Sequence, residues 1–263
     1  MKIIFIGRDN TFNRGVIAWL AHDHEIAACL FVENELFTLK GIINRVRSRS
    51  KKYGVLKAAN EVAFHVFDHL FLRKKDDALL RAYAKDFLTR ELAFPSHDVR
   101  NVNLPEWIDF IRAQDADIVF SVCTTVIFAP ELLHSTRLGT FVVHDGVTPE
   151  YKGLHTTLWA LMKKEPHGLG CTLLRANMAI DSGECLFQQD YKPASNESYK
   201  TWSTVTHKGI LVNLPYMRAA LKQLEAQQHF IPLKTSGRRE GYYTWMGLTD
   251  FVRLYFKYHF RET

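Results

Sequence analysis

The sequence has few cysteines, and none of them stands in a pattern that binds metal. Four cysteines occur in 263 residues, and no two of them form a C-x-x-C pair. Three of the four lie inside apolar runs that predict buried strands, where a free cysteine packs as a small hydrophobic residue. We therefore expect reduced thiols in the core and no disulfide framework.

Long hydrophobic runs are also absent. The first apolar stretch, residues 3–6, is interrupted by Gly7, Arg8 and Asp9, so it is too short for a signal peptide or a membrane span. We expect a cytoplasmic protein that has no membrane partner. No G-x-G-x-x-G pattern follows this stretch, and the sequence therefore does not predict a bound dinucleotide.

Charge is unevenly distributed along the chain. The net charge is +6, yet residues 36–100 alone hold 14 Lys or Arg against 7 Asp or Glu. Within the basic segment 40–57, the cations are concentrated at Arg45, Arg47, Arg49, Lys51 and Lys52. Such a run suits an anionic substrate, a nucleic acid, a membrane surface or simply a solvated helix face, and the sequence does not choose among these.

The order of apolar segments predicts an α/β fold. Strands at 2–6 and 25–32 flank a helix at 15–21, which is a β-α-β unit and predicts a parallel sheet. Residues 36–94 show helical spacing only, so we predict a helical insertion there. Beyond the insertion we expect strands at 116–122, 140–143, 170–174 and 185–189, with helices at 105–113, 130–133 and 155–163. The predicted fold is a Rossmann-like open, mostly parallel sheet.

We expect the chain to divide into an α/β domain over 1–190 and a helical extension over 191–263. Pro215 should split the helical pattern of 204–226. The tail is rich in aromatic residues, including Tyr242, Trp245 and Phe256, which are too many to be wholly exposed. We predict that this tail packs on the body of the protein or forms a homodimer interface.

Two polar residues follow predicted strands at the edge where ligands bind in open α/β sheets. His144 comes after the strand at 140–143, and Asp181 lies in the loop before the strand at 185–189. Around them stand GTFVVHDGVTPEYKG and, 34 residues beyond His144, the sequence MAIDSGECL. A strand and loop reading DIVFSVCTTVIFAPELL precede both.

Together these segments resemble the folate-dependent formyltransferases, which act on glycinamide ribonucleotide, methionyl-tRNA or sugar nucleotides. The resemblance extends weakly over residues 1–30 and well over 104–190. It implies transfer of a formyl group from 10-formyltetrahydrofolate to an amine. It also implies that His144 stabilises the charge developing on the formyl oxygen, and that Asp181 orients His144 and helps to move the amine proton.

One position departs from the family pattern. The resemblance places an asparagine two residues before the histidine, and this chain has Val142 there. Valine has no hydrogen-bond donor, and the loss of one oxyanion donor typically costs about 10² to 10³ in rate. Thr148, Tyr151, His155 and Thr156 are close in sequence, and we name His155 as the catalytic residue that could compensate.

The resemblance also implies binding residues. For the folate donor it indicates Thr125, Val126, Ile127, Phe128, Met178, Ala179 and Ile180. For the acceptor it indicates Arg8, Asn10, Asn13, Tyr151 and Lys152. His65 and His69 stand four residues apart as in some zinc sites, but no third ligand is evident, and we expect no metal.

Three functions remain open. The first is formyl transfer to an amine or hydroxylamine of a small acceptor, such as an amino sugar nucleotide or an amino acid derivative. We do not expect nucleic acid as the acceptor, because helices are predicted where methionyl-tRNA enzymes append a β-rich domain. The second is a non-catalytic or regulatory descendant that binds a ligand without turnover, and the third is transfer of a different acyl group.

Overall fold

The computed structural model describes residues 1–33, 39–84, 94–192 and 202–259. They include a seven-stranded sheet of order β3-β2-β1-β4-β5-β7-β8. Its strands are β1 (Lys2–Gly7), β2 (Glu25–Val32), β3 (Ser96–Val99), β4 (Ile118–Val122), β5 (Gly139–His144), β7 (Gly170–Arg175) and β8 (Glu184–Asp190). Neighbours among β1 to β5 pair in parallel, whereas β7 and β8 are antiparallel. The predicted α/β fold with a mostly parallel sheet is confirmed.

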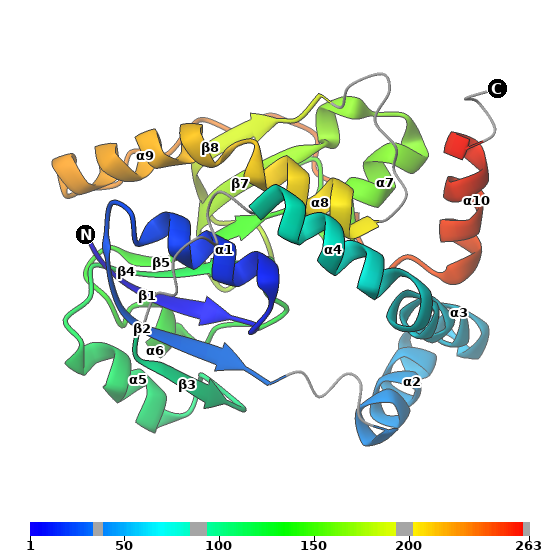
Figure 1. Cartoon of the computed structure of the whole chain (residues 1–263), viewed down its shortest axis with the longest axis horizontal. Coiled ribbons are helices and arrows are strands. Elements are labelled where there is room, and N and C mark those ends of the chain that lie inside the picture. Colours follow the sequence, from blue (N-terminus) through cyan, green and yellow to red (C-terminus); the bar gives the residue numbers. More distant parts are fainter. Residues whose placement is uncertain (34–38, 85–93, 193–201, 260–263) are drawn as a thin grey trace.

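Helices cover both faces of the sheet (Figure 1). In β1, Ile3 and Phe5 pack with α1 (Thr11–Leu20), α4 (Arg73–Ala84), α8 (Trp202–Leu211) and α9 (Leu214–Gln227). Ile4 and Ile6 pack on the other face against α5 (Pro105–Ala113) and α6 (Pro130–Leu133). All four β1 side chains are fully buried, which explains why this strand is a continuous apolar run rather than an alternating one.

The predicted insertion is helical where it is described, and it comprises α2 (Leu39–Tyr53), α3 (Val55–Phe67), the π-helical turn η2 (Asp68–Leu72) and α4. Its predicted ends at 36–38 and 85–93 lie outside the described residues. Leu80 of α4 joins the main core. Phe64 of α3 belongs to a third core with α7 (Thr156–Lys163) and α10 (Leu248–His259). The insertion is therefore an integral part of the fold.

The first helix begins earlier than predicted, at Thr11 rather than at residue 15. The side chain of Asn10 caps it by accepting a hydrogen bond from the backbone N–H of Asn13 (2.8 Å). Strand β3 was not predicted, because its sequence SHDV contains a single apolar residue. It lies at the edge of the sheet, and only its last side chain is buried. Two short segments, β6 (Lys152–Gly153) and β9 (Tyr242–Tyr243), also pair, so the tail returns to the loop after β5.

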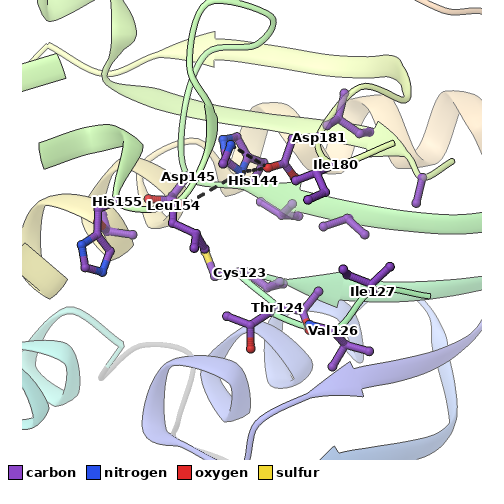
Figure 2. Close-up of a pocket in the computed structure, with 18 of the residues that line it drawn as sticks. Cys123, Thr124, Val126, Ile127, His144, Asp145, Leu154, His155, Ile180 and Asp181 are labelled. Carbon is purple, nitrogen blue, oxygen red and sulfur yellow. Dashed lines mark hydrogen bonds and ion pairs between the residues drawn. The ribbon is translucent and has the colours of Figure 1, made fainter. Parts of the chain in front are cut away.

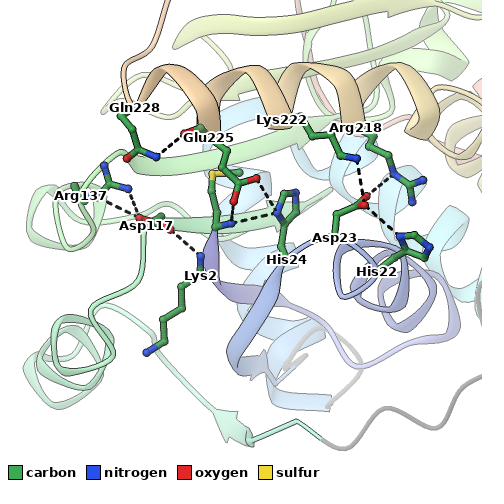
Figure 3. Close-up of polar contacts among 11 residues, drawn as sticks. Lys2, His22, Asp23, His24, Asp117, Arg137, Arg218, Lys222, Glu225 and Gln228 are labelled. Atoms are coloured by element: carbon green, nitrogen blue, oxygen red, sulfur yellow. Dashed lines mark hydrogen bonds and ion pairs between the residues drawn. The ribbon is translucent and has the colours of Figure 1, made fainter.

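The C-terminal helices dock on the body of the protein. Pro215 is the second residue of α9, so the predicted split of the helix is confirmed. Arg218 and Lys222 of α9 form ion pairs with Asp23, which follows α1, at 2.7 and 3.4 Å (Figure 3). Of the tail aromatics, Phe251 is buried, whereas Phe256 is half exposed. Residues 193–201 and 260–263 of the predicted extension are outside the described part, and the homodimer stays a prediction.

All four cysteines are free, as predicted. Cys29, Cys171 and Cys185 are buried in strands β2, β7 and β8. Cys123 differs, because it follows β4 with a left-handed backbone (φ 46°), is only partly buried and lines a pocket at the edge of the sheet.

Candidate active site

A pocket of about 500 Å³ lies where β4 and β5 end. Val122 and Cys123 at the end of β4 contribute to its wall, as do Val142 and His144 of β5. Figure 2 shows Val126, Ile127 and Ile180 on one side of this pocket and His155 on the other, with His144 and Asp181 above Cys123. The predicted position for a ligand in an open α/β sheet is therefore hollow.

His144 and Asp181 form a buried pair in this pocket. The Nδ1 atom of His144 is 3.5 Å from Oδ2 of Asp181, and their side chains are 5% and 17% exposed. On the opposite edge of the ring, Nε2 donates a hydrogen bond to the backbone carbonyl of Tyr151 (2.8 Å). A carbonyl can only accept, so Nε2 holds a proton and Nδ1 faces the carboxylate.

This environment favours the cationic ring. Burial acts to lower the pKa of His144, but the carboxylates of Asp181 and Asp145 and the carbonyl of Tyr151 outweigh it, and the pKa is raised. The raised pKa favours the protonated, positively charged ring, which lies beside the Asp181 carboxyl group. That combination is suited to stabilising negative charge on a carbonyl oxygen.

Local backbone geometry fixes Asp181. The loop between β7 and β8 turns back on itself, and Asp181 has a left-handed backbone (φ 47°). A Cβ atom on Gly183 would lie 1.9 Å from the carbonyl oxygen of Arg175, so only glycine fits this turn. Oδ2 of Asp181 also accepts a hydrogen bond from the backbone N–H of Gly153 (2.9 Å).

A second carboxyl group, Asp145, also lies beside the histidine. Its Oδ1 is 3.9 Å from Nδ1 of His144, and its side chain is 14% exposed. Burial raises the pKa of Asp145; the charge of His144 acts to lower it, and the neighbouring carboxylate of Asp181 acts to raise it. The sequence analysis did not name this residue as functional. The signal for it was its position directly after His144 at the end of a strand.

The seven residues predicted to bind the donor all line the pocket: Thr125, Val126, Ile127, Phe128, Met178, Ala179 and Ile180. They come from the loop after β4 and the loop between β7 and β8, which are far apart in sequence. Ile127 is 65% exposed and Met178 is 61% exposed, so the strip presents open apolar surface. Such surface suits a flat, partly apolar ring system.

Three of the residues predicted to bind the acceptor, Arg8, Asn10 and Asn13, also line the pocket. The two amides hold the first loop together, since Asn10 caps α1 and the Asn13 side chain donates to the carbonyl of Arg8 (2.8 Å). The Arg8 guanidinium donates to Oγ1 of Thr125 (3.2 Å). Arg8 therefore brings a positive charge to the pocket wall beside the apolar strip.

The other two, Tyr151 and Lys152, do not line the pocket. Tyr151 is fully buried, its ring stacks on Tyr243, and its hydroxyl donates to Glu165. The Lys152 ammonium pairs with Glu240 (2.7 Å) and also contacts Ser182 (3.1 Å). Both residues hold the loop after β5 in place, so the structure gives them a different position from the predicted one.

His155 lines the same pocket but does not meet the His144–Asp181 pair. Its Nδ1 accepts a hydrogen bond from the backbone N–H of Met246 (3.2 Å), and its ring lies edge-on to Trp245 at 4.7 Å. Figure 2 shows the ring directed away from Asp181. Val142 lines the pocket as predicted and offers it no donor. The structure therefore brings Asp145, rather than His155, to the side of His144.

The basic segment makes structural contacts. Arg49 forms a buried two-pronged ion pair with Glu61, at 2.6 Å for both hydrogen bonds. Lys52 and Lys57 lie over the ring of Tyr53. The pocket lining includes none of these side chains. Within the described ranges, no group of three or more His, Cys, Asp or Glu side chains is arranged so that it could hold a metal ion, and His65 contributes to the pocket wall.

Comparisons with known proteins bear on the family and the fold of this chain. The family model described as formyl transferase matches residues 44–209. The bifunctional polymyxin resistance protein ArnA of Wigglesworthia glossinidia brevipalpis is 31% identical over 102 residues. That match spans 39% of this chain and only 15% of the relative.

Two solved structures share the fold. A sugar N-formyltransferase from Shewanella sp FDAARGOS_354 superposes with a TM-score of 0.55 at 14% identity, over 95% of this chain and 78% of the other. The sugar 3N-formyltransferase WlaRD, solved in the presence of dTDP and 5-N-formyl-THF, gives a TM-score of 0.52 at 17% identity, over 93% and 69%. In the part of this chain that the structure describes, no helix has the length and apolarity to cross a membrane.

The family match covers more than half of the chain and contains the loop after β4, His144 and Asp181. The chain belongs to the formyl transferase family.

Proposed function

We propose that this protein transfers a formyl group from 10-formyltetrahydrofolate to an amine, or a hydroxylamine, of a small acceptor. Amino sugar nucleotides and amino acid derivatives are the acceptor classes that we favour. The observation that carries the proposal is the buried His144–Asp181 pair, 3.5 Å apart, beside an apolar strip in a pocket of about 500 Å³.

The apolar strip is the proposed donor site. Its open side chains, including Ile127, Met178 and Ile180, would contact the flat pterin ring and exclude water from one face of it. WlaRD was solved with a formylated folate, and this supports the same class of donor here. The donor supplies the formyl carbon, and the remaining steps fall to this chain's own side chains.

In the proposed reaction the acceptor nitrogen attacks the formyl carbon, and negative charge collects on the formyl oxygen. The cationic ring of His144 stabilises that charge by its field. Asp181 accepts the proton that the nitrogen loses and returns it to the departing folate nitrogen when the old carbon–nitrogen bond breaks. The new bond joins the formyl carbon to the acceptor.

For the acceptor we infer a polar molecule that carries negative charge. Arg8 brings a guanidinium to the pocket wall, and Asn10, Thr206 and His207 add polar groups. A phosphorylated acceptor would satisfy Arg8 by a charge-assisted hydrogen bond. The match covers only 15% of the curated relative, so our proposal for the acceptor rests on the residues of this pocket and not on that protein's activity.

Val142 favours a second candidate function, because a pocket that lacks the family's amide donor suits a binding protein without turnover or a transferase for another acyl group. The variant Val142→Asn separates these. A non-catalytic descendant keeps its ligand affinity and gains little activity, whereas an enzyme adapted to valine loses activity.

The test is a formyl-transfer assay with 10-formyltetrahydrofolate and a panel of phosphorylated and unphosphorylated amines. We expect turnover by the unaltered chain and its loss in His144→Ala, with exposed His134→Ala as the matched control. In parallel, a donor at 100 times its dissociation constant should add about 2.7 kcal/mol to the free energy of unfolding. Absence of both turnover and stabilisation would exclude folate as the donor.

A further inference from the structure

We infer that Asp145 is a second catalytic acid of this site: as a neutral carboxylic acid it donates to the formyl oxygen the hydrogen bond that position 142 cannot supply. The inference rests on the proposed formyl transfer. It assigns a role to a residue that neither the fold nor the family resemblance had marked.

The position of Asp145 is fixed by its neighbours. It is the first residue after β5 and lines the pocket next to His144. Its backbone carbonyl accepts from the hydroxyl of Thr156 (2.6 Å), and its Oδ2 accepts from the hydroxyl of Thr157 (3.4 Å). Both threonines belong to the first turn of α7, so the helix holds this carboxyl group at the pocket wall.

One of the two carboxyl groups beside His144 is enough to balance a cationic ring. A second carboxylate in the same buried cluster would face the first, and burial and like charge both favour a proton on that second group. The titratable and charged groups at this end of the pocket are His144 from β5, Asp181 from the loop between β7 and β8, Cys123 from the end of β4 and Arg8 from the loop after β1. The guanidinium of Arg8 donates to Thr125. Burial raises the pKa of Cys123, so the thiol stays neutral and does not change this balance.

Asp145, rather than Asp181, takes that proton. Asp181 is nearer to the ring of His144, at 3.5 Å against 3.9 Å, and it accepts the backbone N–H of Gly153 at 2.9 Å. Both contacts are made by the same oxygen, Oδ2. Asp145 has a longer hydroxyl contact and feels the Asp181 charge, and two carboxyl groups that share one site separate into an acid and a base.

The two carboxyl groups then have complementary tasks. Asp181 is the base for the proton of the attacking amine. Asp145 keeps its own proton and directs it at the formyl oxygen while charge develops there, and the hydrogen bond weakens again as the carbonyl re-forms. The atoms and protons of the transfer stay balanced, because Asp145 is unchanged at the end of the cycle.

The experiment measures kcat and its pH dependence in Asp145 variants that circular dichroism shows to be folded. Asp145→Ala removes the donor and should lower kcat by about 10² to 10³. Asp145→Asn keeps an N–H donor and should lose less than about tenfold on the same scale. Introducing Val142→Asn into the Asp145→Ala chain should raise kcat at least about tenfold, because the new amide supplies the missing donor. Such a rescue shows that positions 142 and 145 are coupled, since the effects of changes at independent sites simply add.

The pH profile is a second readout. The unaltered chain should lose kcat as pH rises and Asp145 ionises, and Asp145→Asn should lack that step. Asp109→Ala, which removes an exposed carboxylate of α5, is the matched control. Infrared spectroscopy gives an independent measure, as the chain without substrates should show a protonated carboxyl band at neutral pH that Asp145→Asn lacks.

Two failures are distinguishable. A chain that transfers no formyl group to any amine overturns the proposed function, whatever the infrared band shows. If the chain is active but Asp145→Ala retains kcat within about threefold of the unaltered chain, the role of Asp145 alone is overturned. The lack of a protonated carboxyl band in an active chain overturns the same role.

Discussion

The Asp181 carboxylate accepts a hydrogen bond from the backbone N–H of Gly153 at 2.9 Å, which ties the loop between β7 and β8 to the loop after β5. The same oxygen lies 3.5 Å from Nδ1 of His144. One carboxylate oxygen therefore both fixes the loop and faces the histidine. Its removal should affect the reaction more than the fold, because the sheet itself does not depend on it.

Replacing Asp181 by alanine should lower kcat by about 10² to 10⁴, the usual contribution of a positioned general acid or base. The Michaelis constant for the donor should change little, since the apolar strip is untouched. Steady-state kinetics at saturating acceptor will measure both. If kcat falls by less than about threefold, Asp181 is not the base.

The charge state of His144 makes stability depend on pH. Its pKa is raised in the folded chain, mainly by Asp181 against the opposing effect of burial, so the cationic ring favours folding. This contribution is complete below the unfolded value of about 6.5 and is lost as pH rises through the folded pKa above it. Urea unfolding across neutral to alkaline pH should therefore show stability falling, and His144→Gln should flatten that fall. If the stability of the unaltered chain instead rises with pH across this window, and that of His144→Gln does not, the assignment is wrong.

Replacing Ile127 by aspartate should weaken donor binding. A buried apolar side chain contributes about 1.5 to 3 kcal/mol, so we expect the dissociation constant of a stable folate analogue to rise at least about tenfold. Isothermal titration calorimetry will measure it. Ile231→Asp is the matched control, because Ile231 is similarly exposed (53% against 65%) and does not line the pocket. Equal effects of the two changes would argue against the apolar strip as the donor site.

Replacing Glu61 by alanine should destabilise the helical insertion. Arg49 is 18% exposed and Glu61 is 3% exposed, so the change leaves a largely buried guanidinium without its partner. Breaking such a pair costs about 3 to 5 kcal/mol, whereas an exposed pair such as Arg112 with Asp109 contributes less than about 1 kcal/mol. Urea denaturation of Glu61→Ala and Asp109→Ala will compare them, and similar losses in the two variants would contradict this account.

Much of the site followed from the sequence because its residues come directly after apolar strands. His144 ends β5, and the loops that carry Ile127 and Met178 begin where β4 and β7 stop. The carboxyl ends of the parallel strands meet at one edge of the sheet, which placed His144 where ligands bind, whereas the donor strip was indicated by the family resemblance. The same resemblance marked position 142 as lacking a donor.

The sequence could not assign the roles of residues whose partners lie far away along the chain. Tyr151 and Lys152 match the family loop, yet Glu165 and Glu240 hold them in structural contacts. His155 follows the same loop, and Met246 and Trp245 from the tail turn it away from Asp181.

The sequence by itself determined the α/β class, the strand ends and the chemical types gathered there, because apolar periodicity and strand boundaries are local properties. Only the tertiary structure decided that Asp145 joins His144 and Asp181 in one buried cluster. The charge states of these three groups depend on distances through space and on exclusion of water, and neither quantity is encoded in sequence spacing.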